Sequence, residues 1–203
     1  MNRYAIIVYV FFVALFGVFC YFANCHNYFP NDVAVSQWLQ KIDFSGAKPI
    51  MQFLPYALLL GVLIALRPWR KENWRPVAFT AGATLAAWAA TWVIKLAVER
   101  PRPDIELVAV MEGKLGSGFP SGHFVCAVVL GGFLIYLMPR LVKSTTAIWC
   151  WRVLLIVIIA LVGVSRIYLG THWLSDIYGG LVLGGLILYP AIVIYRKYEV
   201  NNA

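Results

Sequence analysis

The sequence predicts an all-α, polytopic membrane protein with six transmembrane helices and a short interfacial helix between the first two. Of its 203 residues, 62% are hydrophobic and 13% are charged, whereas a soluble domain is about half apolar and about a quarter charged. Six apolar runs are long enough to cross a bilayer and leave little chain for a separate soluble domain, so residues 1–203 are expected to form a single transmembrane domain. The runs are Ala5–Ala23, Ile50–Leu66, Val77–Val98, Phe119–Met138, Thr145–Ser165 and Trp173–Tyr195.

The charged residues are distributed unevenly between the two sides of the membrane. With the N-terminus in the cytoplasm, the inner segments hold ten basic and two acidic residues, and the outer segments hold seven of each. An excess of lysine and arginine is typical of cytoplasmic segments, so both termini are predicted to be cytoplasmic. Topology therefore accounts for the net charge of +8, and no nucleic-acid partner is predicted.

The first apolar run is interpreted as a retained span, because it is longer than the core of a signal peptide and lacks a small-x-small cleavage site. Four cysteines, at positions 20, 25, 126 and 150, show no metal-ligand spacing. Cys20 and Cys25 both approach the outer face, and the sequence leaves open whether they pair. Neither a metal site nor a cofactor is predicted.

The segment Asn31–Phe44, after the first span, has a helical apolar pattern. Val35, Trp38, Leu39 and Ile42 recur at helical spacing, and Asn31 or Asp32 is placed to cap the start. We expect a short amphipathic helix in the membrane interface. Two roles stay open for it: a lid or lipid guide, or a simple connector.

The second and third spans are joined by a basic loop, Arg67–Arg75, which is typical of a cytoplasmic anchor. The third span is rich in alanine, which allows close helix packing, and it leads into the stretch Lys95–Pro103. That stretch carries three basic residues on the outer side, where the positive-inside rule disfavours them. Prolines fix the chain as it leaves the helix, so the stretch is interpreted as an anion cradle.

A second polar motif, Pro120-Ser-Gly-His123, begins the fourth span. A helix N-terminus offers free backbone N–H groups and a positive dipole end, which together bind phosphate well. Glycine lets a phosphate approach closely, and a histidine at this place is able to donate a proton to a leaving oxygen.

A third polar stretch, Ser165–Asp176, lies between the last two spans. Ionisable groups at the edge of hydrocarbon are costly and are usually functional. His172 and Asp176 are four residues apart, so a helix that starts there places both on one face. The carboxylate can then fix the imidazole tautomer and leave one nitrogen free to attack. With Arg166 as a planar cation for phosphate oxygens, the pattern indicates a histidine nucleophile acting on a phosphate.

The predicted topology brings these three motifs together. Only a short loop separates the first motif from the second, and the 42 residues from His123 to Ser165 suffice for a descent and a return at about 20 residues per crossing. All three motifs should therefore meet at the outer face. Gly180 and Gly184, as a GxxxG pair in the last span, should allow the tight packing that holds them there.

The three motifs in this order, K-x6-R-P from Lys95, P-S-G-H, and S-R-x5-H-x3-D, resemble the type 2 phosphatidic acid phosphatase superfamily, and the six spans are similar to those of its small bacterial integral-membrane members. The resemblance implies a metal-independent mechanism on an all-α core. It implies that His172 is the nucleophile, that Asp176 orients it, and that His123 is the general acid and base. The phosphate would be held by Lys95, Arg102, Ser121, Gly122 and Arg166.

The implied function is a lipid phosphate or pyrophosphate phosphatase in the bacterial cytoplasmic membrane, with its site on the outer, periplasmic or extracellular side. Undecaprenyl pyrophosphate, phosphatidylglycerophosphate and phosphatidate are the implied substrates, and the outward site slightly favours the first. Two other functions remain: a phosphotransferase that passes the phosphoryl group to a lipid or sugar, and a non-enzymatic protein that binds anionic lipid. The sequence does not indicate an oligomeric state.

Overall fold

The computed structural model describes residues 3–42, 46–67, 74–113 and 115–201. Over these ranges the chain forms seven α-helices and no strands. Six of the helices are long and apolar enough to cross a membrane, which confirms the prediction of six spans. The helices are α1 (Arg3–Cys25), α2 (Pro30–Gln40), α3 (Ala47–Ala65), α5 (Arg75–Val98), α6 (Gly122–Leu141), α7 (Thr145–Tyr168) and α8 (Leu174–Val200).

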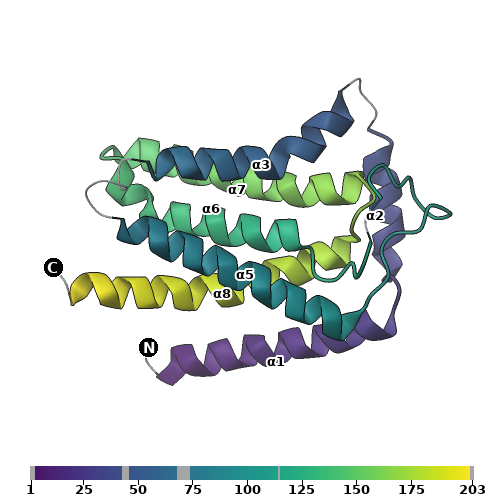
Figure 1. Ribbon diagram of the computed structural model, residues 1–203, viewed down its shortest axis with the longest axis horizontal. Coiled ribbons are helices and arrows are strands. Elements are labelled where there is room, and N and C mark those ends of the chain that lie inside the picture. Colours follow the sequence, from purple (N-terminus) through teal and green to yellow (C-terminus); the bar gives the residue numbers. More distant parts are fainter. Residues whose placement is uncertain (1–2, 43–45, 68–73, 114, 202–203) are drawn as a thin grey trace.

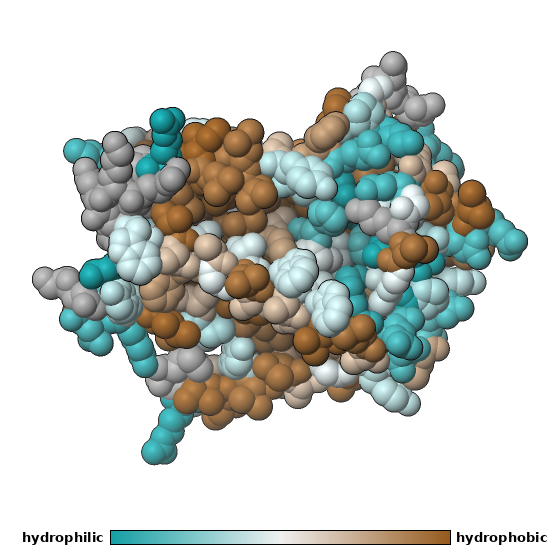
Figure 2. Space-filling view, in the orientation of Figure 1, coloured by the Kyte–Doolittle hydropathy of each residue, from teal (hydrophilic) through white to brown (hydrophobic). Residues whose placement is uncertain are grey.

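The six long helices run side by side, and α2 lies across one end of them, opposite the end that holds both termini (Figure 1). Figure 2 shows apolar surface over the middle of the bundle and mostly polar surface at the α2 end. The basic loop predicted at 67–75 falls largely on residues 68–73, which lie outside the described residues.

Helix α6 is the centre of the bundle. It packs against α3, α5, α7 and α8, and 56% of its most apolar 18-residue window is buried, against 6% for α1. The predicted close packing of the GxxxG pair is confirmed, since a Cβ at Gly184 would lie 2.7 Å from the Val128 side chain and one at Gly180 would lie 3.2 Å from Phe124. Tight α6–α8 contact brings the start of α6 next to the start of α8.

Helix α1 has the least protein contact of the six long helices. It touches α5 and α8, and most of its apolar side chains are exposed, as expected for a surface that lipid covers. Cys20 and Cys25 both lie in this one helix, and both are free in the structure.

Helix α2 was only partly predicted. It begins after Phe29, and Asp32 is its third residue, whose Oδ2 accepts a hydrogen bond from the Phe29 N–H at 2.8 Å. Of the predicted apolar stripe, Val35 and Leu39 pack inward, whereas Trp38 and Ile42 are exposed. The burial of Asp32 was not predicted, and its physical reason is that α2 packs on the polar ends of α7 and α8, where its inner face meets charged groups. Residues 43–45, at the end of the predicted segment, lie outside the described residues.

Candidate active site

All eight predicted site residues lie at the α2 end of the bundle. Lys95 is in the last turn of α5, and Arg102 lies in the loop that follows. Ser121 is the N-cap of α6, and Gly122 and His123 are its first two residues. Arg166 is in the last turn of α7, and Asp176 is in the first turn of α8.

The turn that carries His172 depends on a glycine. Gly170 has φ +66°, a left-handed conformation, and a Cβ there would lie 2.2 Å from the carbonyl oxygen of Ala109. The turn then folds back on the end of α7, because the N–H groups of Thr171 and His172 donate to the Arg166 carbonyl at 3.1 and 3.3 Å. This geometry holds His172 beside the end of α7 and just before α8.

His172 and Asp176 form a buried pair. The exposed fraction of His172 is 2% and that of Asp176 is 0%. Nδ1 of His172 lies 3.4 Å from Oδ2 of Asp176, and the same Oδ2 accepts a hydrogen bond from the Trp173 N–H at 2.9 Å. The predicted four-residue relationship therefore holds, although His172 precedes the helix.

The surroundings of His172 indicate its tautomer. Its Nε2 lies 3.4 Å from Nη1 of Arg102, and a guanidinium only donates hydrogen bonds. Nε2 is thus suited to be the unprotonated nitrogen, with the proton on Nδ1 facing the Asp176 carboxylate. The lone pair of Nε2 is the group that can attack an electrophile.

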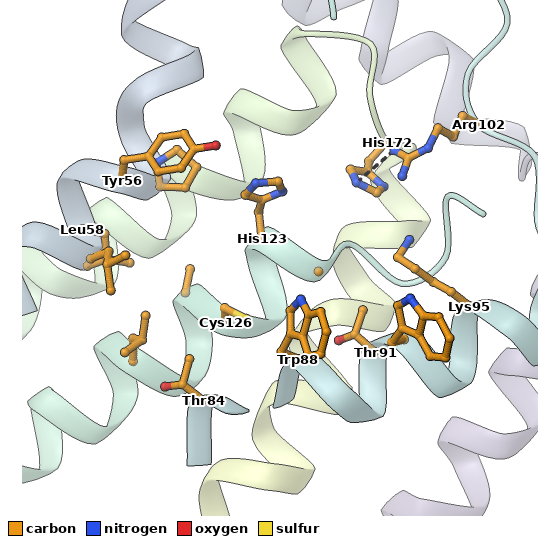
Figure 3. A pocket seen from close by; sticks show the side chains of 16 residues that line it. Tyr56, Leu58, Thr84, Trp88, Thr91, Lys95, Arg102, His123, Cys126 and His172 are labelled. Atoms are coloured by element: carbon orange, nitrogen blue, oxygen red, sulfur yellow. Dashed lines mark hydrogen bonds between the residues drawn. The ribbon is translucent and has the colours of Figure 1, made fainter. Parts of the chain in front are cut away.

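The cavity beside His172 has a volume of about 400 Å³ and is lined by five of the predicted residues: Lys95, Arg102, Gly122, His123 and His172. In Figure 3, the rings of His123 and His172 lie beside each other with a gap between them, and Lys95 and Arg102 lie on the His172 side. Ser121, Arg166 and Asp176 do not line it and are buried next to it.

The cations at the cavity are held by backbone carbonyls. Lys95 donates to the Ser117 carbonyl, and Arg102 donates to Thr171 at 2.8 Å and to Gly116 at 3.1 Å. These contacts fix where the two side chains point. Because a carbonyl group has no net charge, they do not cancel the positive charges of Lys95 and Arg102. A dianion in the cavity would meet this charge directly.

Arg166 is held differently from the other two cations. Its guanidinium donates to the Met51 carbonyl and lies 3.7 Å from a carboxylate oxygen of Glu112. Sequence reasoning missed Glu112, since nothing in the pattern of the loop distinguishes it from the other outer acidic residues. In this structure a carboxylate therefore sits beside one of the predicted phosphate ligands.

The start of α6 offers further donors. The Ser121 side chain is fully buried, and its Oγ makes no hydrogen bond to any residue in the described ranges. A Cβ at Gly122 would lie 3.3 Å from the Thr91 methyl group, so glycine keeps this helix end open to the cavity. The ring of His123 packs edge-on against Tyr56 of α3, with ring centres 6.4 Å apart.

The PAP2 superfamily model matches residues 76–199, which contain all three motifs and all eight predicted site residues. The chain belongs to the PAP2 superfamily. Helices α1, α2 and α3 precede the matched region, so the family model does not include them.

Similar proteins include membrane phosphatases. Phosphatidylglycerophosphatase B of Bacillus subtilis (strain 168) is 37% identical over 101 residues, which make up 48% of this chain and 47% of the relative, so the match spans about half of each. A candidate undecaprenyl-diphosphatase of Escherichia coli (strain K12) is 25% identical over 162 residues, 78% of this chain and 75% of the relative.

The fold is also found among solved structures. The crystal structure of a transmembrane PAP2 type phosphatidylglycerolphosphate phosphatase from Bacillus subtilis superposes with a TM-score of 0.74 at 23% sequence identity, covering 91% of this chain and 96% of that chain. At this identity the likeness establishes the fold, which is that of a membrane-embedded PAP2 protein.

One basic residue of the first PAP2 motif does not face the cavity. Arg100, which the sequence groups with the anion cradle, is 1% exposed and donates to Asp176 and Asp32 at 2.7 and 3.1 Å. The expectation of three basic residues in one cradle is therefore wrong for Arg100. Its partner Asp32 lies 68 positions earlier in the chain, so no local sequence pattern predicts this contact.

The electrostatics of His172 give a testable pH dependence. Burial lowers the pKa of His172 from 6.5 to about 4; the nearby Arg102 and Lys95 act in the same direction, and Asp176 opposes them. A lowered pKa means that the imidazole stays neutral, and thus nucleophilic, down to mildly acidic pH. We expect the His172 signals in an NMR titration of ¹³C-histidine-labelled protein to have a midpoint near 4, whereas an ordinary histidine titrates at about 6.5.

The His172 signals are assigned by their loss in His172→Ala. At pH 5 an ordinary histidine would be about 97% protonated, so the two cases are well separated. A His172 midpoint near 6.5 would contradict this account of its environment.

Proposed function

We propose that this PAP2 protein is a membrane lipid phosphatase that hydrolyses a lipid phosphomonoester or pyrophosphate through a phosphohistidine on His172. The observation that carries the proposal is the cavity that His172 lines together with Lys95, Arg102 and His123, with Nε2 of His172 lying 3.4 Å from the Arg102 guanidinium. A nucleophile, fixed positive charge and an acid for the leaving group are what phosphoryl transfer requires.

The proposed first step is attack by Nε2 of His172 on phosphorus. An N–P bond forms as the P–O bond to the leaving group breaks, and His123 donates a proton to the departing oxygen. The imidazole gains positive charge in this step, and the Asp176 carboxylate stabilises it at Nδ1. The leaving group is a lipid alkoxide or a lipid phosphate.

The proposed second step is hydrolysis of the phosphohistidine. His123, now neutral, takes a proton from a water molecule, whose oxygen attacks phosphorus and releases the phosphate from His172. Lys95 and Arg102 bind phosphoryl oxygens throughout, and Arg166 joins them when phosphate replaces the Glu112 carboxylate beside it. Ser121 Oγ and the backbone N–H of Gly122 supply further donors at the start of α6.

A lipid substrate fits the surroundings of the cavity. A second cavity of about 390 Å³ shares Leu59, Thr84, Trp88, Cys126 and Leu130 with the first and continues between α3 and α5 to Leu66 and Val77, near the other end of the bundle. Its lining is almost entirely apolar. We propose that an acyl or prenyl chain lies along this groove while the phosphate reaches His172.

The proposed orientation follows from charge. Both termini lie at the end of the bundle opposite the site, and the positive-inside rule puts them in the cytoplasm. The site then faces the periplasm or the exterior from a bacterial cytoplasmic membrane. The proposed mechanism needs no metal, since the fixed cations neutralise the phosphoryl charge.

The proposal is tested by phosphate release from detergent-purified protein in excess EDTA. The substrates are phosphatidylglycerophosphate, undecaprenyl pyrophosphate and phosphatidate, and His172→Ala is the control. We expect release from at least one substrate that survives EDTA and vanishes in the variant. Phosphatidylglycerophosphate is tested first, because a similar sequence and a similar solved structure, both from Bacillus subtilis, are named for it. Loss of release in EDTA that returns with added Mg²⁺ would contradict the metal-independent mechanism.

A further inference from the structure

Arg100 is almost fully buried, with an exposed fraction of 1%. Its Nη1 donates to Asp176 Oδ1 and to Ser175 Oγ, both at 2.7 Å, and its Nη2 donates to Asp32 Oδ2 at 3.1 Å. Its guanidinium also lies 4.9 Å from the centre of the Phe29 ring. Its Nε donates to the His26 carbonyl, just after α1, at 3.0 Å. Its side-chain hydrogen-bond partners all lie in α2 and α8, so Arg100 joins these two helices.

The two oxygens of Asp176 have separate partners. Oδ1 binds Arg100, whereas Oδ2 faces Nδ1 of His172 and accepts the Trp173 N–H. The two oxygens of a carboxylate are equivalent, so a half-turn about the Cβ–Cγ bond would change nothing, but a partial rotation would move Oδ2 out of line with Nδ1 of His172. The contact with Arg100 opposes such a partial rotation, so it keeps an acceptor in front of Nδ1 and favours the tautomer that is protonated there.

Asp32 fixes Arg100 in turn. Its Oδ1 accepts the Ser175 N–H at 2.8 Å, and its Oδ2 accepts the Ser175 hydroxyl at 2.6 Å and an Arg100 N–H. Asp32 is 2% exposed, and a buried carboxylate is retained only where such partners compensate its lost hydration. The chain of contacts therefore runs from α2 through Arg100 to the Asp176 carboxylate.

We propose that Arg100 and Asp32 are positioning residues for the His172–Asp176 pair, so that α2 is part of the machinery that prepares the nucleophile. This inference rests on the proposed function of His172. It assigns α2 a role different from both a lid and a simple connector, and it lies partly outside the region that the PAP2 model matches, since Asp32 precedes residue 76. Neither residue lines the cavity beside His172.

The charges of this cluster allow a positioning role to be separated from a structural one. Asp32, Arg100 and Asp176 together carry one net negative charge. Arg100→Gln leaves two buried carboxylates without their cation, which is expected to destabilise the protein. The double variant Asp32→Asn/Arg100→Gln restores the net charge of the cluster but leaves Oδ1 of Asp176 without its charged donor.

The test compares Arg100→Gln, the double variant and Arg100→Lys in the full-length protein, with phosphatidylglycerophosphate as substrate. We expect the double variant to recover the thermal stability lost in Arg100→Gln, yet to keep a kcat lower by about 10- to 100-fold, the range for groups that orient a directly acting residue. KM should stay within about threefold, because the cations that bind phosphate are unchanged. Arg100→Lys should recover part of kcat, since an ammonium reaches one carboxylate but not both.

A matched control removes another anchor of α2. Gln40 bonds the backbone of Ala109 and Tyr168 and does not touch Asp176. Gln40→Ala should lower thermal stability while keeping kcat near the wild-type value. An equal loss of kcat in Gln40→Ala and in the double variant would overturn the proposal, because any loosening of α2 would then suffice.

A second readout does not depend on activity. The ¹⁵N shifts of His172 report which nitrogen carries the proton, and we expect the Nδ1–H form in the wild type and a mixture of tautomers in the double variant. Wild-type kcat together with an unchanged tautomer in the double variant would overturn the positioning role. Absence of phosphate release from the wild type itself would instead overturn the proposed function, and the tautomer would still decide the role of Arg100.

Discussion

His172→Ala is expected to reduce phosphate release to the uncatalysed background, a loss of about six orders of magnitude for a residue that forms the covalent intermediate. The reason is that, among the described residues that line the cavity, His172 combines an Nε2 beside Arg102 with an Nδ1 that faces the buried Asp176 carboxylate. Water would have to attack phosphorus directly, and the fixed cations alone do not supply a nucleophile.

The measurement is a steady-state assay with phosphatidylglycerophosphate, at enzyme concentrations high enough to detect a rate about 10⁵-fold below wild type. Arg140→Gln is the matched control, because Arg140 pairs with Glu199 in the half of the bundle away from the site. It should retain normal turnover. More than about 1% residual activity in His172→Ala would exclude a nucleophilic role, since such roles contribute far more than 100-fold.

His123→Ala is expected to lower turnover of a lipid phosphate by about 10²- to 10⁴-fold, the usual contribution of a general acid. A lipid alkoxide is a poor leaving group and needs a proton as the P–O bond breaks. A p-nitrophenolate ion needs none. The variant should therefore still transfer phosphate from p-nitrophenyl phosphate to His172, and it should then stall because the water for the second step is not activated.

The corresponding measurement is a stopped-flow trace of p-nitrophenolate release. We expect a burst of about one equivalent per enzyme molecule in His123→Ala, followed by a slow steady state. The same loss of rate with the lipid and with the activated ester, and no burst, would mean that His123 acts in binding and not as an acid.

Much of the fold was predictable from the sequence. Each of the six apolar runs is long enough to cross the bilayer as a helix. A chain in lipid must satisfy its backbone hydrogen bonds internally, so few other conformations are open to these runs. The convergence of the motifs was also predictable, since spans of fixed length force Lys95, His123 and His172 to one side of the membrane. The boundaries differed by a few residues, as for α6, which begins at Gly122 and not at Phe119.

The partners of the buried charges were not predictable. Arg100 and Arg102 are two positions apart, and both are flanked by proline in a motif that indicates anion binding. The structure turns one toward the cavity and the other toward Asp32 and Asp176. The choice depends on where α2 packs, and the local apolar pattern of α2 does not reveal that its inner face meets buried charges.

The central claim is that phosphate passes through His172, and rapid-quench trapping with ³²P-labelled lipid phosphate tests it most directly. Wild type and His172→Ala are mixed with the labelled lipid, and His123→Ala with ³²P-labelled p-nitrophenyl phosphate; all are quenched in base, where phosphohistidine survives, and the labelled peptide is sequenced. We expect label on residue 172 that forms and decays in the wild type, accumulates from the activated ester in His123→Ala and is absent from His172→Ala. Label on another residue, or turnover by the wild type with no labelled protein at any time, would contradict it.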